Sequence, residues 1–196
     1  KKLRSLMRIP FVVYDGYFAE NKGICNLVID NYDGGVQVGN YLYQKGHRKV
    51  LCISDNNICT DKERMDGCRA GMKQAGADFL EVPYTAAQRH DFYVKNLTII
   101  MQYTAVFAVS DTYAIELMHF LQERGIRIPK DISIVGFDNM GLCERVYPRL
   151  TTVGQDAGER AKMAVAALQK LKAGEEVNAV QTLPVSLVER ESVAGV

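Results

Sequence analysis

The residues AVFAVSDTYAIELMHFLQERGIRIPKDISIVGFDN, at positions 105–139, show the pattern of a strand, a helix and a second strand in succession. Two short apolar runs rich in β-branched residues, 105–109 and 132–137, each have the length of a buried strand. The segment between them ends near Gly125 and repeats apolar residues at helical spacing, at Ala114, Leu117, Met118 and Leu121. This order predicts two parallel strands joined by a crossover helix.

The same alternation extends in both directions along the chain. Further strands are expected over residues 11–14, 26–29, 49–54, 79–82, 150–153 and 183–188. One helix is expected to carry Val38, Tyr41 and Leu42 and to end at Gly46, and another is expected to begin at Asp61. The chain therefore predicts an α/β fold with parallel sheets flanked by helices, and it shows no internal sequence repeat.

The helix with the clearest boundaries is expected over residues 156–173. Asp156 and Glu159 have the spacing of a capping box, and Gly174 supplies the stop. Its apolar face is predicted to consist of Ala161, Ala164, Val165, Leu168 and Leu171.

The composition is that of an ordinary globular protein. Of 196 residues, 47% are hydrophobic and 24% charged, which excludes a disordered tail or a fibrous chain. The formal net charge is only +1, so no overall positive field draws this chain onto DNA, and contact with DNA would need another segment. The length allows one large domain or two smaller lobes.

The cysteines and the N-terminal residues indicate the cellular compartment of the protein. The five cysteines are an odd number without a CxxC pair, and Cys52 and Cys68 fall at apolar positions, so we expect buried thiols in a reducing compartment. No apolar run is long enough to span a bilayer, and residues 1–10 lack a signal-peptide core. The first residue is not Met, and we therefore expect that the sequence is a fragment.

Polar residues follow several of the predicted strands, where open parallel sheets bind their ligands. They are Asp15, Asp30, Ser110, Asp111, Asp138 and Gln155. Asp and Ser at such positions are also typical of turns and helix N-caps, which is the role expected for Asp111. Arg64 has two alternatives, a solvated surface arginine or an inward donor. Carboxylates with a planar arginine between them suit a polyhydroxylated ligand.

Catalytic and nucleotide-binding motifs are absent from the sequence. The glycines GGVQVG at 34–39 match neither GxGxxG nor a phosphate-binding GxxxxGK[ST] loop. The three histidines match no HExxH spacing, and no GxSxG elbow occurs. We therefore expect no enzymatic activity, no cofactor and no metal.

Five blocks of the sequence carry a family resemblance. They are NLVIDNYDGGVQVGNYLYQKGHRKVLCIS (26–54), ERMDGCRAGMKQAG (63–76), FAVSDTYAIELMHFLQERGIRIPKDISIVGFDN (107–139), YPRLTTVGQDAGERA (147–161) and LPVSLVERES (183–192). In this order they resemble the effector-binding core of the lactose-repressor (LacI/GalR) family of bacterial transcription regulators.

The resemblance implies a periplasmic-binding-protein-like core of two interleaved lobes. Residues 1–32 and 155–181 would form part of the N-terminal lobe, and residues 33–154 and 182–196 the C-terminal lobe. The DNA-binding head and the first half of the N-terminal lobe are expected to be missing from this sequence. A half lobe leaves a sheet edge and apolar surface uncovered, so we expect either a longer natural protein or a second copy over that edge.

The resemblance also assigns residues to the effector site in the cleft between the lobes. Arg64 matches the arginine of the family's RxxG motif, and Asp138 matches the first acid of its GFDD motif. The full predicted set is Asp15, Thr60, Arg64, Tyr84, Ser110, Asp138 and Gln155. Around Thr60 and Tyr84 the sequence departs from the family pattern.

The implied function is that of a ligand-sensing domain of a cytoplasmic regulator. A sugar or nucleobase effector would bind in the cleft and control allosterically how a helix-turn-helix head outside this sequence binds operator DNA. The protein is expected to form a homodimer and to have no contact with a membrane. The alternative is an exported sugar-binding protein of a transporter, which has the same lobes and no head.

Overall fold

The computed structural model describes residues 10–15, 24–55 and 59–196. The chain divides into two compact units. Unit 1 consists of residues 1–30 and 155–185, and unit 2 consists of residues 31–154 and 186–196. These boundaries lie within four residues of those expected from the sequence for the two lobes.

Unit 2 is built on a parallel sheet with the strand order β4-β3-β5-β6. Its strands are β3 (Val50–Ser54), β4 (Asp78–Glu81), β5 (Ala105–Ala108) and β6 (Ser133–Val135). Every residue of β3 and β5 is buried, which fits strands covered on both faces and explains their uninterrupted apolar runs.

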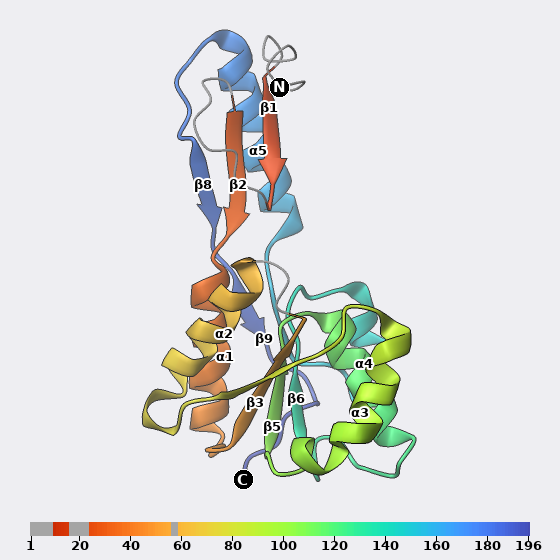
Figure 1. Cartoon of the computed structure of the whole chain (residues 1–196). Coiled ribbons are helices and arrows are strands. Elements are labelled where there is room, and N and C mark those ends of the chain that lie inside the picture. Colours follow the sequence, from red (N-terminus) through yellow and green to blue (C-terminus); the bar gives the residue numbers. More distant parts are fainter. Residues whose placement is uncertain (1–9, 16–23, 56–58) are drawn as a thin grey trace. The chain divides into compact units, whose positions relative to one another are not determined.

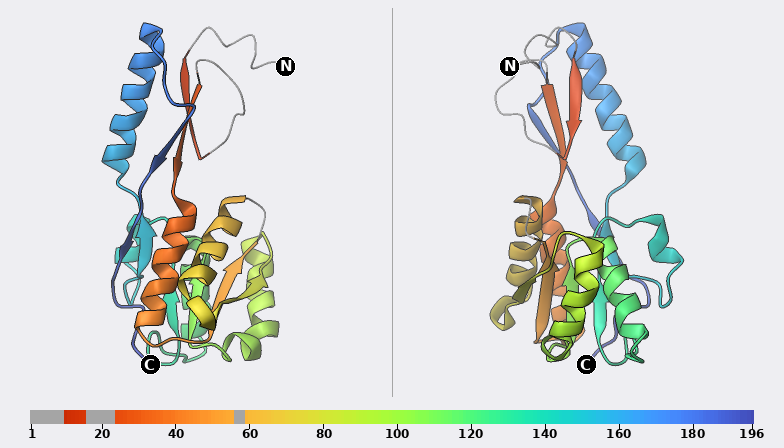
Figure 2. Two further views of the ribbon diagram at one scale, coloured as in Figure 1. Left: turned by 90° about the vertical axis from the view of Figure 1, so that its left-hand side faces the viewer. Right: turned by 45° about the vertical axis from the view of Figure 1, so that its right-hand side comes forward.

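Helices cover both faces of this sheet (Figures 1 and 2). The pair α1 (Asn31–Gln44) and α2 (Cys59–Gly71) lies on one face, and α3 (Ala86–Ile100) and α4 (Asp111–Gln122) lie on the other. Two 3-10 turns, η2 (Lys73–Ala75) and η3 (Gly141–Glu144), and an antiparallel pair, β7 (Thr152–Gly154) with β9 (Ser186–Val188), complete the unit.

Glycines bring α1 and α2 into backbone contact. A Cβ atom on Gly35 would lie 2.1 Å from the carbonyl oxygen of Arg64, and one on Gly67 would lie 2.1 Å from that of Tyr32. Neither position accommodates a side chain. The glycine-rich segment at 34–39 is therefore a helix-packing surface, and this packing fixes the position of Arg64 on α2.

The described residues of unit 1 form three parallel strands and one helix. The sheet order is β1-β2-β8, with β1 (Phe11–Tyr14), β2 (Ile24–Ile29) and β8 (Val180–Leu183), and α5 (Ala157–Ala173) packs on β1 and β2. The predicted caps of α5 are confirmed. Asp156 Oδ1 accepts a hydrogen bond from the Glu159 N–H at 2.9 Å, and Gly174 ends the helix in the left-handed conformation with φ 77°.

The predicted apolar face of α5 is only partly correct. Ala164 is buried as expected, but the other buried residue is Ala167, whereas Val165 and Leu168 are 53% and 36% exposed. The inner stripe passes instead through Arg160, one turn before Ala164. Apolar residues on two adjacent stripes prevented the sequence pattern from selecting the buried one.

Two further expectations are corrected. The sequence pattern did not identify α3, and the single strand expected at 183–188 is two strands, β8 and β9, separated by Pro184 and Val185. Proline has no N–H to donate to a ladder, and here the chain passes from the sheet of unit 1 to the β-pair of unit 2.

The cysteines are all free thiols. Cys52 and Cys68 are buried as expected, Cys25 and Cys143 are buried too, and Cys59 is exposed. Within the described ranges, no helix has the length and apolar character needed to cross a bilayer.

Candidate functional site

Arg64 is the centre of a polar cluster at the carboxyl edge of the sheet in unit 2. Its Nη1 donates to the carbonyl oxygen of Val109 at 2.7 Å and to Asp138 Oδ1 at 3.3 Å, and its Nε donates to Asn31 Oδ1 at 2.8 Å. The guanidinium carbon lies 3.8 Å from the ring centroid of Phe137. The side chain is only 11% exposed, so the alternative of a solvated arginine is wrong.

Asp138 has an unusual backbone that presents its carboxylate to Arg64. Its φ is +114°, outside the common regions for a residue with a Cβ, and its N–H donates to the carbonyl of Val153 at 2.7 Å. Such outliers concentrate at functional sites, where the surrounding structure holds them in place. The side chain is partly exposed, so it is accessible to a ligand as well as to Arg64.

Ser110 is the N-cap of α4, a role that the sequence analysis expected of Asp111. Ser110 caps α4, because its Oγ accepts from the Thr112 N–H at 3.2 Å. Asp111 is fully buried and accepts from Thr152 Oγ1 at 2.6 Å and from the Met140 N–H at 2.8 Å. Burial raises the pKa of Asp111. This carboxylate therefore ties β7 to the loop after Asp138.

The side-chain hydrogen bonds and the ring contact of Arg64 given above include neither Thr60 nor Tyr84. Thr60 is half-buried in the first turn of α2. The Tyr84 ring is 73% exposed, and the Tyr84 carbonyl accepts a hydrogen bond from Arg89 Nη1. Their assignment to the effector site remains a prediction.

A second polar cluster lies in unit 1 and includes an arginine that the sequence analysis missed. Asp15 follows the last residue of β1, and its Oδ2 lies 2.6 Å from Arg160 Nη2 on α5. The Arg160 guanidinium carbon lies 4.6 Å from the centroid of the Tyr14 ring. The predicted residue Gln155 belongs to the same unit, two residues before α5.

The predicted site residues therefore form two groups, one on each unit. In unit 2, Ser110 and Asp138 come after β5 and β6, and Arg64 extends from α2 to Asp138. In unit 1, Asp15 follows β1 and Gln155 precedes α5. No signal in the sequence pointed to Arg160, because the apolar pattern of α5 did not select the buried stripe on which this arginine lies.

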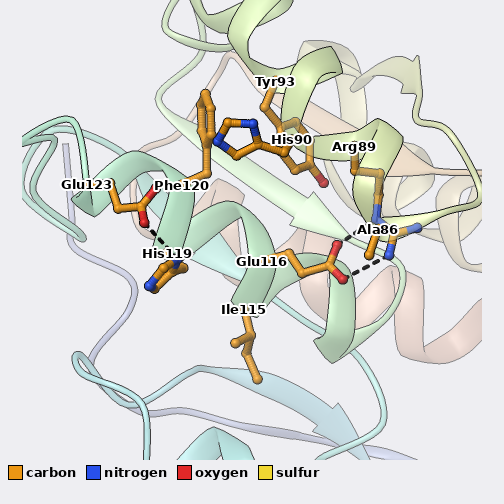
Figure 3. A pocket seen from close by; sticks show the side chains of 9 residues that line it. All are labelled: Ala86, Arg89, His90, Tyr93, Ile115, Glu116, His119, Phe120 and Glu123. Carbon is orange, nitrogen blue, oxygen red and sulfur yellow. Dashed lines mark hydrogen bonds and ion pairs between the residues drawn. The ribbon is translucent and has the colours of Figure 1, made fainter.

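Unit 2 also has a pocket of about 360 Å³ between α3 and α4 (Figure 3). Arg89 and Glu116 bridge its two helices through a bidentate pair, with Nε–Oε2 at 2.5 Å and Nη2–Oε1 at 2.8 Å. The pocket shares no residue with the cluster around Arg64; its lining is Ala86, Arg89, His90, Tyr93, Ile115, Glu116, His119, Phe120 and Glu123. Across the described ranges, no three His, Cys, Asp or Glu side chains are grouped to hold a metal ion.

Comparison with known proteins agrees with the resemblance seen in the sequence. Residues 40–193 match the family model of the periplasmic binding protein-like domain. The chain is 34% identical over 196 residues to the HTH-type transcriptional repressor PurR of Vibrio cholerae serotype O1 (strain M66-2). That match covers 94% of this chain and 57% of the repressor, so the chain spans little more than half the length of this relative.

Solved structures give the same result. A LacI family transcriptional regulator from Enterococcus faecalis V583, with bound ribose, superimposes with a TM-score of 0.85 at 28% identity, covering 99% of this chain and 72% of that one. A periplasmic binding protein/LacI transcriptional regulator from Alkaliphilus metalliredigens QYMF, complexed with D-xylulofuranose, has a TM-score of 0.84 at 30% identity, with coverages of 95% and 71%. The expected periplasmic-binding-protein-like α/β fold is confirmed.

Proposed function

The chain belongs to the periplasmic binding protein-like domain family, as the effector-binding core of a LacI/GalR-type regulator, and we propose that it senses a small sugar. In this proposal, sugar binding controls how a part of the protein outside this sequence binds DNA. The proposal includes no enzymatic step.

The observation that supports sugar binding is the pairing of Arg64 with Asp138. A guanidinium offers several fixed N–H donors, and an ionised carboxylate accepts hydrogen bonds through two oxygens. Side by side, the two groups offer hydrogen-bond donors and acceptors to neighbouring hydroxyls of one sugar. Asn31 and the Val109 carbonyl hold the arginine in this orientation before any ligand arrives.

Regulation requires that the sugar bind one arrangement of the protein better than another, because a ligand shifts an equilibrium only by its difference in affinity. The regulator is favoured over the transporter protein because the relative in Vibrio cholerae is named as a transcriptional repressor. Five free thiols fit the reducing cytoplasm expected for a regulator.

Calorimetric titration of the chain with D-ribose and with D-xylulose tests the proposal. Arg64→Ala should weaken binding about 10- to 100-fold, because hydrogen bonds to a charged group contribute roughly 1.5–3 kcal/mol. Arg127→Ala is the matched control, since Arg127 is an exposed arginine of unit 2 paired with Asp131. Sugar binding that is equally strong in Arg64→Ala and the wild type would contradict the proposal.

We further propose that the regulator is a homodimer whose contact includes the face of unit 2 around α3 and α4. On this face, Val94 and Ile99 of α3 are 48% and 43% exposed. The backbone of Tyr147 contacts α4 through Gln122, while its ring is 85% exposed. Exposed apolar surface of this kind marks protein interfaces, and dimers most often use the same patch on both copies.

Analytical ultracentrifugation measures the dimer directly. Ile115→Glu should raise the dimer dissociation constant at least tenfold, because it buries an unpaired charge in the contact. Val165→Glu, on the exposed face of α5, is the control on unit 1. A monomeric wild type, or a dimer indifferent to Ile115→Glu, would exclude this face.

A further inference from the structure

The loop that carries Asp138 has an unusual backbone at two consecutive residues. Asp138 has φ +114° and Asn139 has φ +51°, values that residues with a Cβ rarely adopt. Such a conformation persists only where the surrounding structure holds it. Asp138 is the carboxylate that meets Arg64 in the proposed sugar site. The contacts that hold this loop therefore determine how the carboxylate is presented to a ligand.

Main-chain hydrogen bonds hold the two ends of the loop. The N–H of Asp138 donates to a carbonyl of β7 at 2.7 Å, and the N–H of Met140 donates to Asp111 Oδ2 at 2.8 Å. Between them, the N–H of Asn139 makes a longer contact of 3.4 Å with Thr152 Oγ1. The main chain alone therefore holds the middle of the loop less firmly than its ends.

Arg190 anchors the side chain of the middle residue. Its Nη2 donates to Asn139 Oδ1 at 2.7 Å, while its Nη1 donates to the Leu150 carbonyl at 2.8 Å. The Arg190 N–H also donates to Thr151 Oγ1 at 2.9 Å, which holds the arginine itself in place. Asn139 can lie this close to β7 because Gly154 has no side chain; a Cβ there would lie 2.4 Å from the Cβ of Asn139.

Strand pairing brings Arg190 to the loop. Arg190 follows β9 by two residues, and β9 pairs with β7, the strand on which the loop rests. Asn139 lies 51 residues earlier in the chain. The loop, β7, β9 and Arg190 all belong to unit 2. The contact between Arg190 and Asn139 is therefore a property of this unit by itself.

We propose that Arg190 is a positioning residue of the sugar site, which acts through Asn139 to hold Asp138 in the orientation that meets Arg64. This inference rests on the proposed function, because it takes a sugar as the ligand of the Arg64–Asp138 pair. Arg190 then contributes to sugar affinity without touching the sugar.

Ion pairing does not explain why Arg190 is buried. Its side chain is only 9% exposed, whereas arginine side chains usually lie at the surface. The carboxylate nearest to it, Glu144, is 70% exposed and lies 3.3 Å from Nη2. An ion pair with a solvated acid contributes little to stability.

The planar shape of the guanidinium does explain this position. Two of its nitrogens donate in fixed directions to two oxygens, on Leu150 and on Asn139. A lysine ammonium is a point charge and lacks such a fork. The arrangement suits a group that orients a neighbouring side chain.

A double-mutant cycle on sugar affinity tests the inference. D-ribose and D-xylulose are titrated calorimetrically into the whole chain with Asn139→Gly, Arg190→Met or both changes. Asn139 is exposed, and glycine adopts positive φ freely, so Asn139→Gly removes the anchored side chain without disturbing the core or adding backbone strain. Arg149→Met is the matched control, because Arg149 is an exposed arginine of unit 2 paired with Glu191.

Asn139→Gly should weaken sugar binding about tenfold, the effect of losing one hydrogen bond to a charged group. Arg190→Met should weaken it by at least as much. The double variant should bind no more weakly than Arg190→Met alone, because both changes break the same contact. Asn139→Asp keeps an acceptor for Arg190 and should bind within a factor of about three of the wild type. Arg149→Met should bind like the wild type.

Urea titration separates positioning from general stability. Arg190→Met also removes the bond to Leu150, so it should lower the urea midpoint of unit 2. Asn139→Gly should weaken sugar binding while its urea midpoint stays close to that of the wild type. If Asn139→Gly binds sugar as tightly as the wild type, Arg190 has a structural role only and the inference is overturned.

The cycle also distinguishes this inference from the proposed function. Losses of affinity that add in the double variant would mean that Arg190 acts by another route, and this too overturns the inference. In either case, sugar binding that depends on Arg64 leaves the proposed function standing. A wild type that binds neither sugar contradicts the proposed function, and this inference fails with it.

Discussion

Arg64 and Arg160 make the same pair of contacts, yet the two units hold them to different degrees. Arg64 donates to three acceptors, and its helix packs backbone to backbone on α1. Arg160 is held by Asp15 and by the Tyr14 ring alone among the described residues. Folding therefore fixes the group in unit 2 through many elements, whereas the group in unit 1 depends on its own members.

The same contrast applies to the cores. In unit 2, buried side chains from strands and helices form one cluster that includes Ile53, Leu117 and Ile134. In unit 1, α5 buries only Ala164 and Ala167 and exposes Val165 and Leu168. Because apolar burial is the main source of stability, unit 2 should resist unfolding more strongly than unit 1.

Truncating one large apolar side chain in each unit gives the largest expected difference. Phe107 is fully buried in β5, so Phe107→Ala should lower the free energy of unfolding of unit 2 by about 3–5 kcal/mol. Leu168→Ala should lower that of unit 1 by less than about 1 kcal/mol, because its side chain is already partly exposed.

Urea titration followed by hydrogen exchange at the amides of β5 and β2 assigns each loss to its unit. Equal losses for the two variants would mean that α5 is covered in solution, as expected if further chain or a second copy lies over Leu168.

The sequence predicted the sheet strands of unit 2 and the caps of α5 because each depends on neighbours along the chain. Burial on both faces makes β3 and β5 read as unbroken apolar runs, and Asp156 meets the Glu159 N–H within a single turn. The sequence pattern did not predict helix α3, because the buried stripe of this helix includes the charged residue Arg89. The partner of Arg89 is Glu116, which lies on another helix.

The polar cluster of Tyr14, Asp15 and Arg160 in unit 1 was not predicted as a cluster for a related reason. An aromatic residue followed by aspartate is not specific, since Tyr32 and Asp33 repeat it inside α1. The Tyr14–Asp15 pair is distinguished by its contact with Arg160, which lies far along the chain and which only the fold brings close. Arg64 was identified from the family resemblance, whereas Arg160 matches no motif that the sequence analysis used, so only the structure shows that the two arginines correspond.

The smallest expected difference between the units is their response to mild acid. All three histidines of the sequence lie in unit 2, and His47 is fully buried there. Its Nδ1 lies 2.8 Å from Thr104 Oγ1 and its Nε2 lies 3.0 Å from the Ala194 carbonyl. Burial lowers the pKa of His47 from its usual value of 6.5.

Below pH 6.5 the unfolded chain therefore takes up a proton that native His47 does not, so stability present above that pH is lost as the pH falls toward the native pKa. A pKa that is lower by one in the folded protein corresponds to about 1.4 kcal/mol of folding stability. Between pH 7 and pH 5, urea titration should show unit 2 losing stability while unit 1 changes little, and His47→Gln should flatten the profile of unit 2. A profile for His47→Gln as steep as that of the wild type would assign the acid response to other groups, because glutamine does not titrate in this range.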